Sequence, residues 1–168
     1  MTMEAARWAD PADLPEVLDL AREAAYSMQA QRGGPMWFRR EARPEPYEAE
    51  LVEALAGAEG RRVAVGMLDD VVVGYAIVRP EHLHDRSLLW VVTDIYVTPE
   101  ARGVGVGEAL MDAVVAGARQ AGAEGIDSIA LPGDRGTKNF FERFGLTARA
   151  IVVHKSLVGS EATDGHVP

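Results

Sequence analysis

The stretch Leu88–Gly107, LLWVVTDIYVTPEARGVGVG, decides the fold, because it joins the most strand-like part of the chain to a glycine-rich loop. Its first ten residues, Leu88–Val97, are mostly leucine, β-branched or aromatic, a composition that favours an extended strand. Glu108–Gln120, after the loop, has apolar residues at helical spacing and predicts an amphipathic helix. Strict alternation would divide the strand's side chains between two faces: Leu89, Val91, Thr93, Ile95 and Val97 on one, and Trp90, Val92, Asp94 and Tyr96 on the other.

The loop Arg102–Gly107, RGVGVG, brings several backbone N–H groups together with the positive end of a helix. Its alternating glycines let the backbone approach a ligand without hindrance from a Cβ atom. We therefore interpret the loop as a candidate anion site, with an ordinary tight turn as the alternative. Two nucleotide-binding motifs do not fit: a P-loop needs Lys and Ser or Thr where Glu108 and Ala109 stand, and a dinucleotide fingerprint needs glycine at Glu108 or Leu110.

Outside this stretch, helical and strand patterns follow one another without a repeat or an interdomain linker. Asp10, followed by Pro11, is typical of a helix N-cap, and Gln31–Pro35 breaks that helix after Gln29. A second helical pattern, opened by Pro44 and Pro46, ends around Gly57. The remaining expected elements are strands at Met3–Trp8, Arg62–Met67, Val71–Val78, Ile126–Leu131 and Leu146–Val153, and a helix at Thr137–Phe144. This order predicts an α/β (α+β) domain around one central mixed sheet.

Length and composition limit the classes of function. The 168 residues are the length of one domain, to which we assign residues 1–157, and we expect residues 158–168 to be a disordered tail. The formal net charge of -9 disfavours nucleic acid and anionic membranes as partners and mildly favours a cationic substrate. The absence of cysteine excludes disulfides, cysteine nucleophiles and cysteine-ligated metals. With no signal-peptide pattern and no apolar run of about 18 residues, a cytoplasmic location is expected.

Three residues of the loop, Arg102, Gly105 and Gly107, match the specified positions of the pattern Gln/Arg-x-x-Gly-x-Gly/Ala. This pattern is the signature of the GNAT superfamily of acyl-CoA-dependent N-acyltransferases, which the chain resembles. The resemblance continues through Ile95–Pro99 and Phe140–Leu146, and it covers Leu88 to Val153. It implies a GNAT-like fold with a mixed, mostly antiparallel sheet flanked by helices, and it leaves a homodimer open.

The resemblance also implies that acetyl-CoA is the cosubstrate. The backbone of Ile95 and Val97 would pair with the pantetheine amides as a further strand would. Arg102 would contact a phosphate, although an arginine that closes the loop is the alternative. The pyrophosphate would be held by backbone N–H groups along Gly103, Val104, Gly105, Val106, Gly107 and Glu108. Asp134 and Phe141 stand where the family often has an asparagine and a tyrosine near the cofactor, and both belong to the expected binding set.

GNAT enzymes transfer the acetyl group directly from thioester to amine in a ternary complex, a route compatible with the lack of cysteine. The resemblance therefore implies an N-acetyltransferase that acts on a primary amine of a small molecule or a protein. Phe141 has no proton to give, but a thiol pKa of about 8.5 makes the thiolate a tolerable leaving group, with water or Tyr96 as the donor. The same substitution keeps open a second hypothesis, a degenerate, non-catalytic acyl-CoA sensor.

Asp94 is the candidate general base, because it interrupts an apolar strand, where an unpaired carboxylate would be costly. The alternatives are a carboxylate paired with an arginine or exposed where the sheet opens. Tyr96 is predicted on the same face, either in the acceptor pocket or in the core. Trp37 and Phe38 predict a mobile lid over the acceptor, with hydrophobic anchoring as the alternative. His82, His84 and Asp85 lie together in one loop, but their spacing is weak for a metal and we predict no metal site.

Overall fold

The computed structural model describes residues 3–158, so the expected tail, apart from Val158, lies outside the described residues. The strands are β1 Glu4–Trp8, β2 Arg62–Leu68, β3 Val71–His82, β4 Leu88–Val97 and β5 Gly125–Ser128. The helices are α1 Leu14–Gln29, α2 Gly34–Arg40, α3 Tyr47–Leu55, α4 Val106–Gln120 and α5 Arg135–Arg143, with short 3-10 turns at Pro11–Asp13, Ala58–Gly60 and Pro99–Ala101. None of the helices in this part of the chain is long and apolar enough to cross a membrane.

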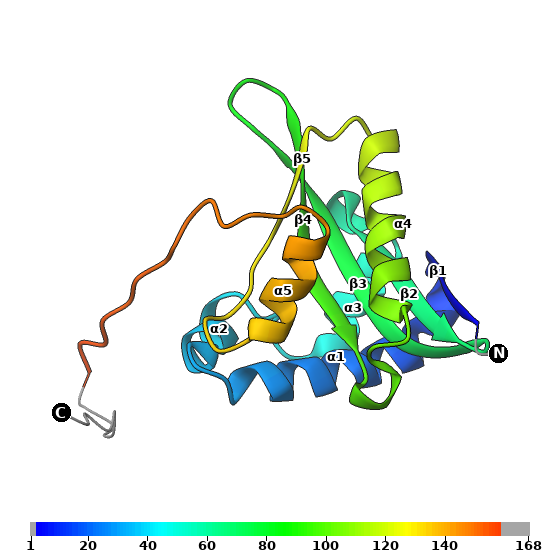
Figure 1. The fold of residues 1–168 in the computed structure, drawn as a ribbon, viewed down its shortest axis with the longest axis horizontal. Coiled ribbons are helices and arrows are strands. Elements are labelled where there is room, and N and C mark those ends of the chain that lie inside the picture. Colours follow the sequence, from blue (N-terminus) through cyan, green and yellow to red (C-terminus); the bar gives the residue numbers. More distant parts are fainter. Residues whose placement is uncertain (1–2, 159–168) are drawn as a thin grey trace.

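The strands form one mixed sheet in the order β1-β2-β3-β4-β5. The pairs β1–β2, β2–β3 and β3–β4 are antiparallel, and the pair β4–β5 is parallel. This arrangement confirms the predicted mixed, mostly antiparallel sheet. Figure 1 shows α4 on one side of the sheet and α1 and α3 on the other. Alternate residues of β2 and β3 therefore supply two cores: Val63, Val65, Tyr75 and Ile77 face α1 and α3, whereas Ala64, Ala76 and Val78 face α4.

A capping box fixes the start of the first helical segment and confirms Asp10 as an N-cap. The Asp10 carboxylate accepts from the Ala12 N–H at 2.8 Å, and the Asp13 carboxylate accepts from the Asp10 N–H at 2.9 Å. Arg7 of β1 donates to both oxygens of Asp13, at 2.8 and 2.7 Å. The edge strand and the start of α1 are therefore held together by one bidentate pair, the stronger geometry for an arginine and a carboxylate.

A β-bulge in β4 corrects the predicted alternation of its side chains. Asp94 lies opposite Ile77 of β3, but Val92 lies opposite Val78, so Thr93 is an extra residue in the ladder. The extra residue reverses the faces beyond it. Strict alternation would place Ile95 and Val97 on the face opposite to Trp90 and Val92. In the structure, five residues of β4 pack on the α4 side: Leu88, Trp90, Val92, Ile95 and Val97. Tyr96 packs on the α1 side.

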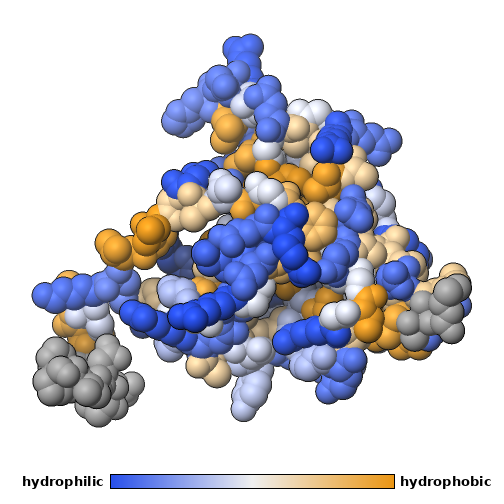
Figure 2. Space-filling model, viewed as in Figure 1, coloured by the Kyte–Doolittle hydropathy of each residue, from blue (hydrophilic) through white to orange (hydrophobic). Residues whose placement is uncertain are grey.

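The predicted end of the first helix at Gln29 is confirmed. The helix α2, which was not predicted, begins directly after this break, because Pro35 occupies the start of a helix, where proline fits and its missing N–H is not needed. The prediction of a last strand was wrong, because Leu146–Val153 pairs with no strand of the described chain. Its composition favours β-structure, but its backbone has no ladder partner, and Ile151, Val152 and Val153 are 81–88% exposed. This extended segment leaves the body of the molecule in Figure 1 and is partly orange, hydrophobic, in Figure 2.

Candidate functional site

The two halves of β4 differ in their neighbours. β4 pairs with β5 only from Leu89 to Val92, and the Ser128 hydroxyl donates to the Val92 carbonyl at 3.1 Å where the two strands part. β5 ends at Ser128 and not at Leu131 as predicted. Thr93–Val97 is therefore bordered by β3 on one side, while no strand of residues 3–158 borders it on the other.

The open edge carries backbone groups of two predicted residues. The Thr98 N–H donates to the Val73 carbonyl at 2.9 Å, in register with the β3–β4 pairing. In an antiparallel ladder, alternate residues direct their N–H and C=O groups to the same neighbour. Tyr96 and Thr98 therefore bond to β3, and Ile95 and Val97 direct their backbone groups to the open edge. An extended chain of amides could bond to them as a sixth strand would.

The glycine-rich loop leads from this edge to the N-terminus of α4. Gly103 and Gly105 have φ angles of 79° and 100°, in the left-handed region that favours glycine. Gly105 is the N-cap of α4, and no side chain caps the helix there. The N–H groups of its first turn lack intrahelical acceptors, and nothing lies within 4 Å of a Cβ built on Gly103. The loop thus offers open N–H donors and a positive helix end to an anion.

Phe140 lies against this loop. A Cβ added to Gly107 would lie 3.1 Å from the Phe140 ring, so the glycine lets α5 pack closely on the first turn of α4. The Phe141 ring lies 5.7 Å from the Phe140 ring, and Phe141 is buried, at 6% exposure. A contact between Phe141 and a cofactor stays a prediction.

Asp134 caps α5. Its Oδ1 accepts from the Thr137 N–H at 2.9 Å, and its Oδ2 accepts from the Thr137 hydroxyl at 2.6 Å. Both oxygens therefore hold the helix start. A contact between Asp134 and a cofactor stays a prediction.

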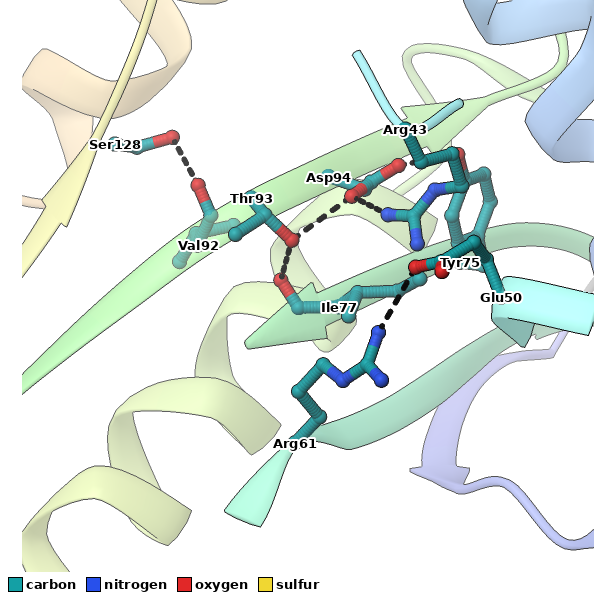
Figure 3. A network of polar contacts seen from close by, with 9 residues as sticks. All are labelled: Arg43, Glu50, Arg61, Tyr75, Ile77, Val92, Thr93, Asp94 and Ser128. Atoms are coloured by element: carbon teal, nitrogen blue, oxygen red, sulfur yellow. Dashed lines mark hydrogen bonds and ion pairs between the residues drawn. The ribbon is translucent and has the colours of Figure 1, made fainter. Parts of the chain in front are cut away.

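Asp94 is surrounded by three donors (Figure 3). Its Oδ1 is in an ion pair with Arg43 and accepts from the Thr93 hydroxyl at 2.8 Å, the shorter contact of that hydroxyl. Its Oδ2 accepts from the Tyr75 hydroxyl at 3.0 Å. The Asp94 carboxylate is therefore paired with an arginine, which is one of the two structural alternatives that the sequence left open for this residue.

Tyr75 keeps its proton at neutral pH. Its side chain is fully buried, and burial, reinforced by the negative charge of Asp94, raises the pKa of Tyr75 well above its ordinary value. Tyr75 is consequently a permanent donor to Asp94. Oδ1 of Asp94 accepts from two partners and Oδ2 from one, so Oδ1 is the more crowded oxygen.

Tyr96 and Arg102 lie together at the far end of β4. The Tyr96 hydroxyl is 3.3 Å from Glu23 Oε2 on α1, and burial, with the charge of Glu23, raises the pKa of Tyr96. The Arg102 guanidinium lies 5.3 Å from the centre of the Tyr96 ring and donates through Nε to the Val97 carbonyl at 2.8 Å. Arg102 thus lies over the end of the open edge, where it occupies one of the two carbonyls described above.

A protein-family model matches most of the chain. The model described as "Acetyltransferase (GNAT) family" matches residues 19–146. The chain belongs to this family. The match begins within α1 and extends past α5, so it includes the open edge of β4 and the glycine-rich loop.

Similar proteins include aminoglycoside acetyltransferases. Aminoglycoside N(6')-acetyltransferase type 1 of Stenotrophomonas maltophilia is 38% identical over 88 residues, 50% of this chain, and the match spans only 57% of that protein. A solved structure of AAC(6')-Iy with the bisubstrate analogue CoA-S-monomethyl-acetylneamine has a TM-score of 0.72 at 18% identity, covering 92% of this chain and 97% of that one. An aminoglycoside acetyltransferase from an uncultured soil metagenomic sample, in complex with sisomicin, has a TM-score of 0.69 at 21% identity, covering 94% and 97%. These two structures share the GNAT fold.

Sequence reasoning missed several residues that the GNAT frame brings to this site. Arg43, Tyr75 and Glu23 come from distant parts of the chain, and Arg43 is 51 residues from Asp94. No local pattern marks them. Trp37 and Phe38 lie on α2, next to the connection that carries Arg43, and their role as a lid stays a prediction.

The histidine loop lies elsewhere. His82 ends β3 and His84 follows in the tip of the β3–β4 hairpin, where the Leu83 N–H donates to the Ser87 carbonyl at 3.0 Å. Across residues 3–158, no group of three or more His, Cys, Asp or Glu side chains is arranged to hold a metal ion.

Proposed function

We propose that this GNAT protein is an N-acetyltransferase that transfers an acetyl group from acetyl-CoA directly to a primary amine in a ternary complex. The observation that carries the proposal is the continuity of the open edge of β4 with the uncapped N-terminus of α4. The first offers amide partners and the second offers a site for phosphate, so one extended ligand with both chemistries fits them.

The residues present suit the two ends of acetyl-CoA. The backbone of Ile95 and Val97 would bond to the pantetheine amides, with Arg102 turning away from the Val97 carbonyl toward a phosphate. Val104, Val106 and the other loop residues from Gly103 to Glu108 would hold the pyrophosphate through their N–H groups. The open space beside Gly103 supports this assignment, because a substituent there would meet nothing within 4 Å and a ligand has room.

Transfer requires the amine nitrogen to attack the thioester carbonyl carbon, so that an N–C bond forms and the C–S bond breaks. Backbone N–H groups at the open edge near Ile95 would stabilise the oxyanion. Asp94 would take the proton that the ammonium must lose. Tyr96, which like an ordinary tyrosine is protonated at neutral pH, would give a proton to the departing thiolate in place of the tyrosine that Phe141 replaces.

We infer that the acceptor is a small cationic amine, with a protein amine as the alternative. On the α1 side of β4, the Asp94 carboxylate accepts from Tyr75 and the Glu23 carboxylate accepts from Tyr96. The whole chain carries a formal charge of -9. Carboxylates on this face would attract a polycation. The aminoglycoside acetyltransferases named above support this class of acceptor.

The direct test is the release of CoA thiol on incubation with acetyl-CoA and a panel of amines. A thiol-reactive dye reports only CoA, because the protein has no cysteine. We expect release that depends on the amine, with aminoglycosides among the best acceptors. Tight binding of acetyl-CoA without release for any amine would contradict the proposal and favour the acyl-CoA sensor that Phe141 leaves open.

A further inference from the structure

Arg43 reaches Asp94 from the periphery of the molecule. It belongs to the connection Glu41–Pro46 between α2 and α3, most of which is exposed. The ion pair with Asp94 is the one polar side-chain contact recorded, within residues 3–158, between this connection and β4. The side chains of Arg43 and Asp94 are 13% and 18% exposed, so the pair is shielded from water but still reachable (Figure 3).

The three donors to Asp94 differ in how easily they can leave. Tyr75 is buried in β3 at 1% exposure, and Thr93 is the bulged residue of β4 itself. Displacing Tyr75 would disturb the sheet. The Thr93 hydroxyl can rotate toward the Ile77 carbonyl, 3.3 Å away, but it carries no charge that a substrate cation would replace. Arg43 is largely covered, at 13% side-chain exposure, but it belongs to a surface connection, so its withdrawal breaks one ion pair and leaves both strands intact.

The proposed function creates a conflict at this carboxylate. An acceptor ammonium that hands its proton to Asp94 must come within hydrogen-bonding distance of it. The Arg43 guanidinium lies at Oδ1, which also accepts from the Thr93 hydroxyl, and it repels a second cation at that oxygen. An ammonium that binds at Oδ1 therefore requires Arg43 to move.

We propose that Arg43 is a tethered competitor of the acceptor: its guanidinium holds the place of the substrate ammonium at Asp94, and a polycationic amine replaces it. This inference rests on the proposed function. A monoamine exchanges one cation for another and gains little at Asp94. A polyamine can also contact Glu23, which lies beside Tyr96, two residues beyond Asp94 on β4. This second ion pair supplies the binding free energy that displaces Arg43. Arg43 thus selects polycationic acceptors.

Arg43→Met tests the exchange, and Arg61→Met is the matched control. Arg61 has the same 13% side-chain exposure and pairs with Glu50 and Glu53 at 3.4 Å, with no recorded contact to β4. The probe is sisomicin, and its Kd and that of acetyl-CoA are measured by calorimetry. Arg43→Met should bind sisomicin about tenfold more tightly, because removal of one partner leaves an uncompensated carboxylate. Acetyl-CoA binding should not change in either variant, and Arg43→Lys, which keeps the cation, should resemble the wild type.

A latch role for Arg43 predicts the opposite sign. If the ion pair orders the acceptor site, Arg43→Met weakens sisomicin binding, and this result overturns the proposal. So does an unchanged Kd, or the absence of sisomicin binding to both proteins.

A second measurement uses the wild-type protein, in case Arg43→Met does not fold. Saturating sisomicin should speed amide hydrogen exchange in residues 41–46, since their tie to β4 is released, and slower or unchanged exchange contradicts the proposal. Wild-type turnover of acetyl-CoA with sisomicin is measured in parallel. No turnover with any amine counts against the proposed function, whereas turnover with an unchanged Kd in Arg43→Met counts only against the role of Arg43.

Discussion

The two halves of β4 differ in composition and in pairing: Leu88–Val92 is wholly apolar, whereas Thr93–Val97 contains Thr93, Asp94 and Tyr96. Leu88–Val92 is bordered by β3 and β5 and buries Trp90 and Val92. Thr93–Val97, beyond the bulge, keeps one edge open and carries Asp94 and Tyr96. A strand that is paired on both edges satisfies its own backbone, and a strand with one free edge offers its backbone to a ligand. The first half should therefore govern stability and the second half should govern activity.

Trp90→Ala is the strongest test of the paired half. Trp90 is 4% exposed, forms an edge-to-face contact with Trp8 at 6.2 Å and packs against Gly117. Its removal leaves a large cavity, so the free energy of unfolding should fall by about 3–5 kcal/mol, measured by urea denaturation. Trp37→Ala, on the peripheral helix α2, is the control and should cost less. A loss below about 1 kcal/mol for Trp90→Ala would contradict the assignment of stability to this half.

Tyr96→Phe is the corresponding test of the open half. If the Tyr96 hydroxyl gives the proton to the thiolate, kcat should fall about 100-fold while the unfolding free energy changes little. Steady-state kinetics and a thermal melt measure the two effects. Tyr26→Phe, at an 81% exposed tyrosine of α1, should leave both unchanged. An unaltered kcat in Tyr96→Phe would show that water or another group is the donor.

Gly105→Ala tests the end of the open half, where the loop begins α4. The φ angle of 100° strains any side chain, and the new Cβ would lie 3.0 Å from Glu4. Reshaping the loop should raise the KM for acetyl-CoA about tenfold. Gly122→Ala carries a similar strain at φ 78°, with open space around it, at the other end of α4. It should leave this KM unchanged, and equal effects in both variants would mean that strain alone is responsible.

Glu23→Gln should have the smallest effect on kcat, a shift in its pH dependence. Burial and the negative charge of Glu23 raise the pKa of Tyr96, so the protonated form persists above the ordinary tyrosine pKa of about 10. Removing the charge lowers this pKa, and the alkaline limb of the kcat profile should move to lower pH. Glu16→Gln, on an exposed turn of the same helix, should not move it. If the alkaline limb does not move, the protonation of Tyr96 does not limit kcat.

The comparison of the two halves also shows what the sequence could predict. Composition and spacing predicted β4 with its correct bounds and the glycine-rich loop that follows it. The role of the Ile95 and Val97 backbone came from the family resemblance and stays a prediction. The bulge was missed, because an extra residue in a ladder depends on the register of the partner strand and leaves no periodic trace. Arg43 was missed for a related reason: an ion pair across 51 residues is set by the fold alone. Leu146–Val153 was predicted from composition, which cannot say whether a partner edge exists.

That unpaired segment bears on how the protein can be handled. β5 is an edge strand, and Ile151–Val153 have almost fully exposed apolar side chains, so both an open edge and an extended apolar segment are available for strand pairing between molecules. Like charge keeps the molecules apart at neutral pH, where the chain carries -9. The isoelectric point is near pH 4.9, so acidification toward that pH removes the repulsion between molecules and favours precipitation. Colloidal stability of concentrated samples is therefore a matter of buffer choice, with alkaline buffers the safer ones.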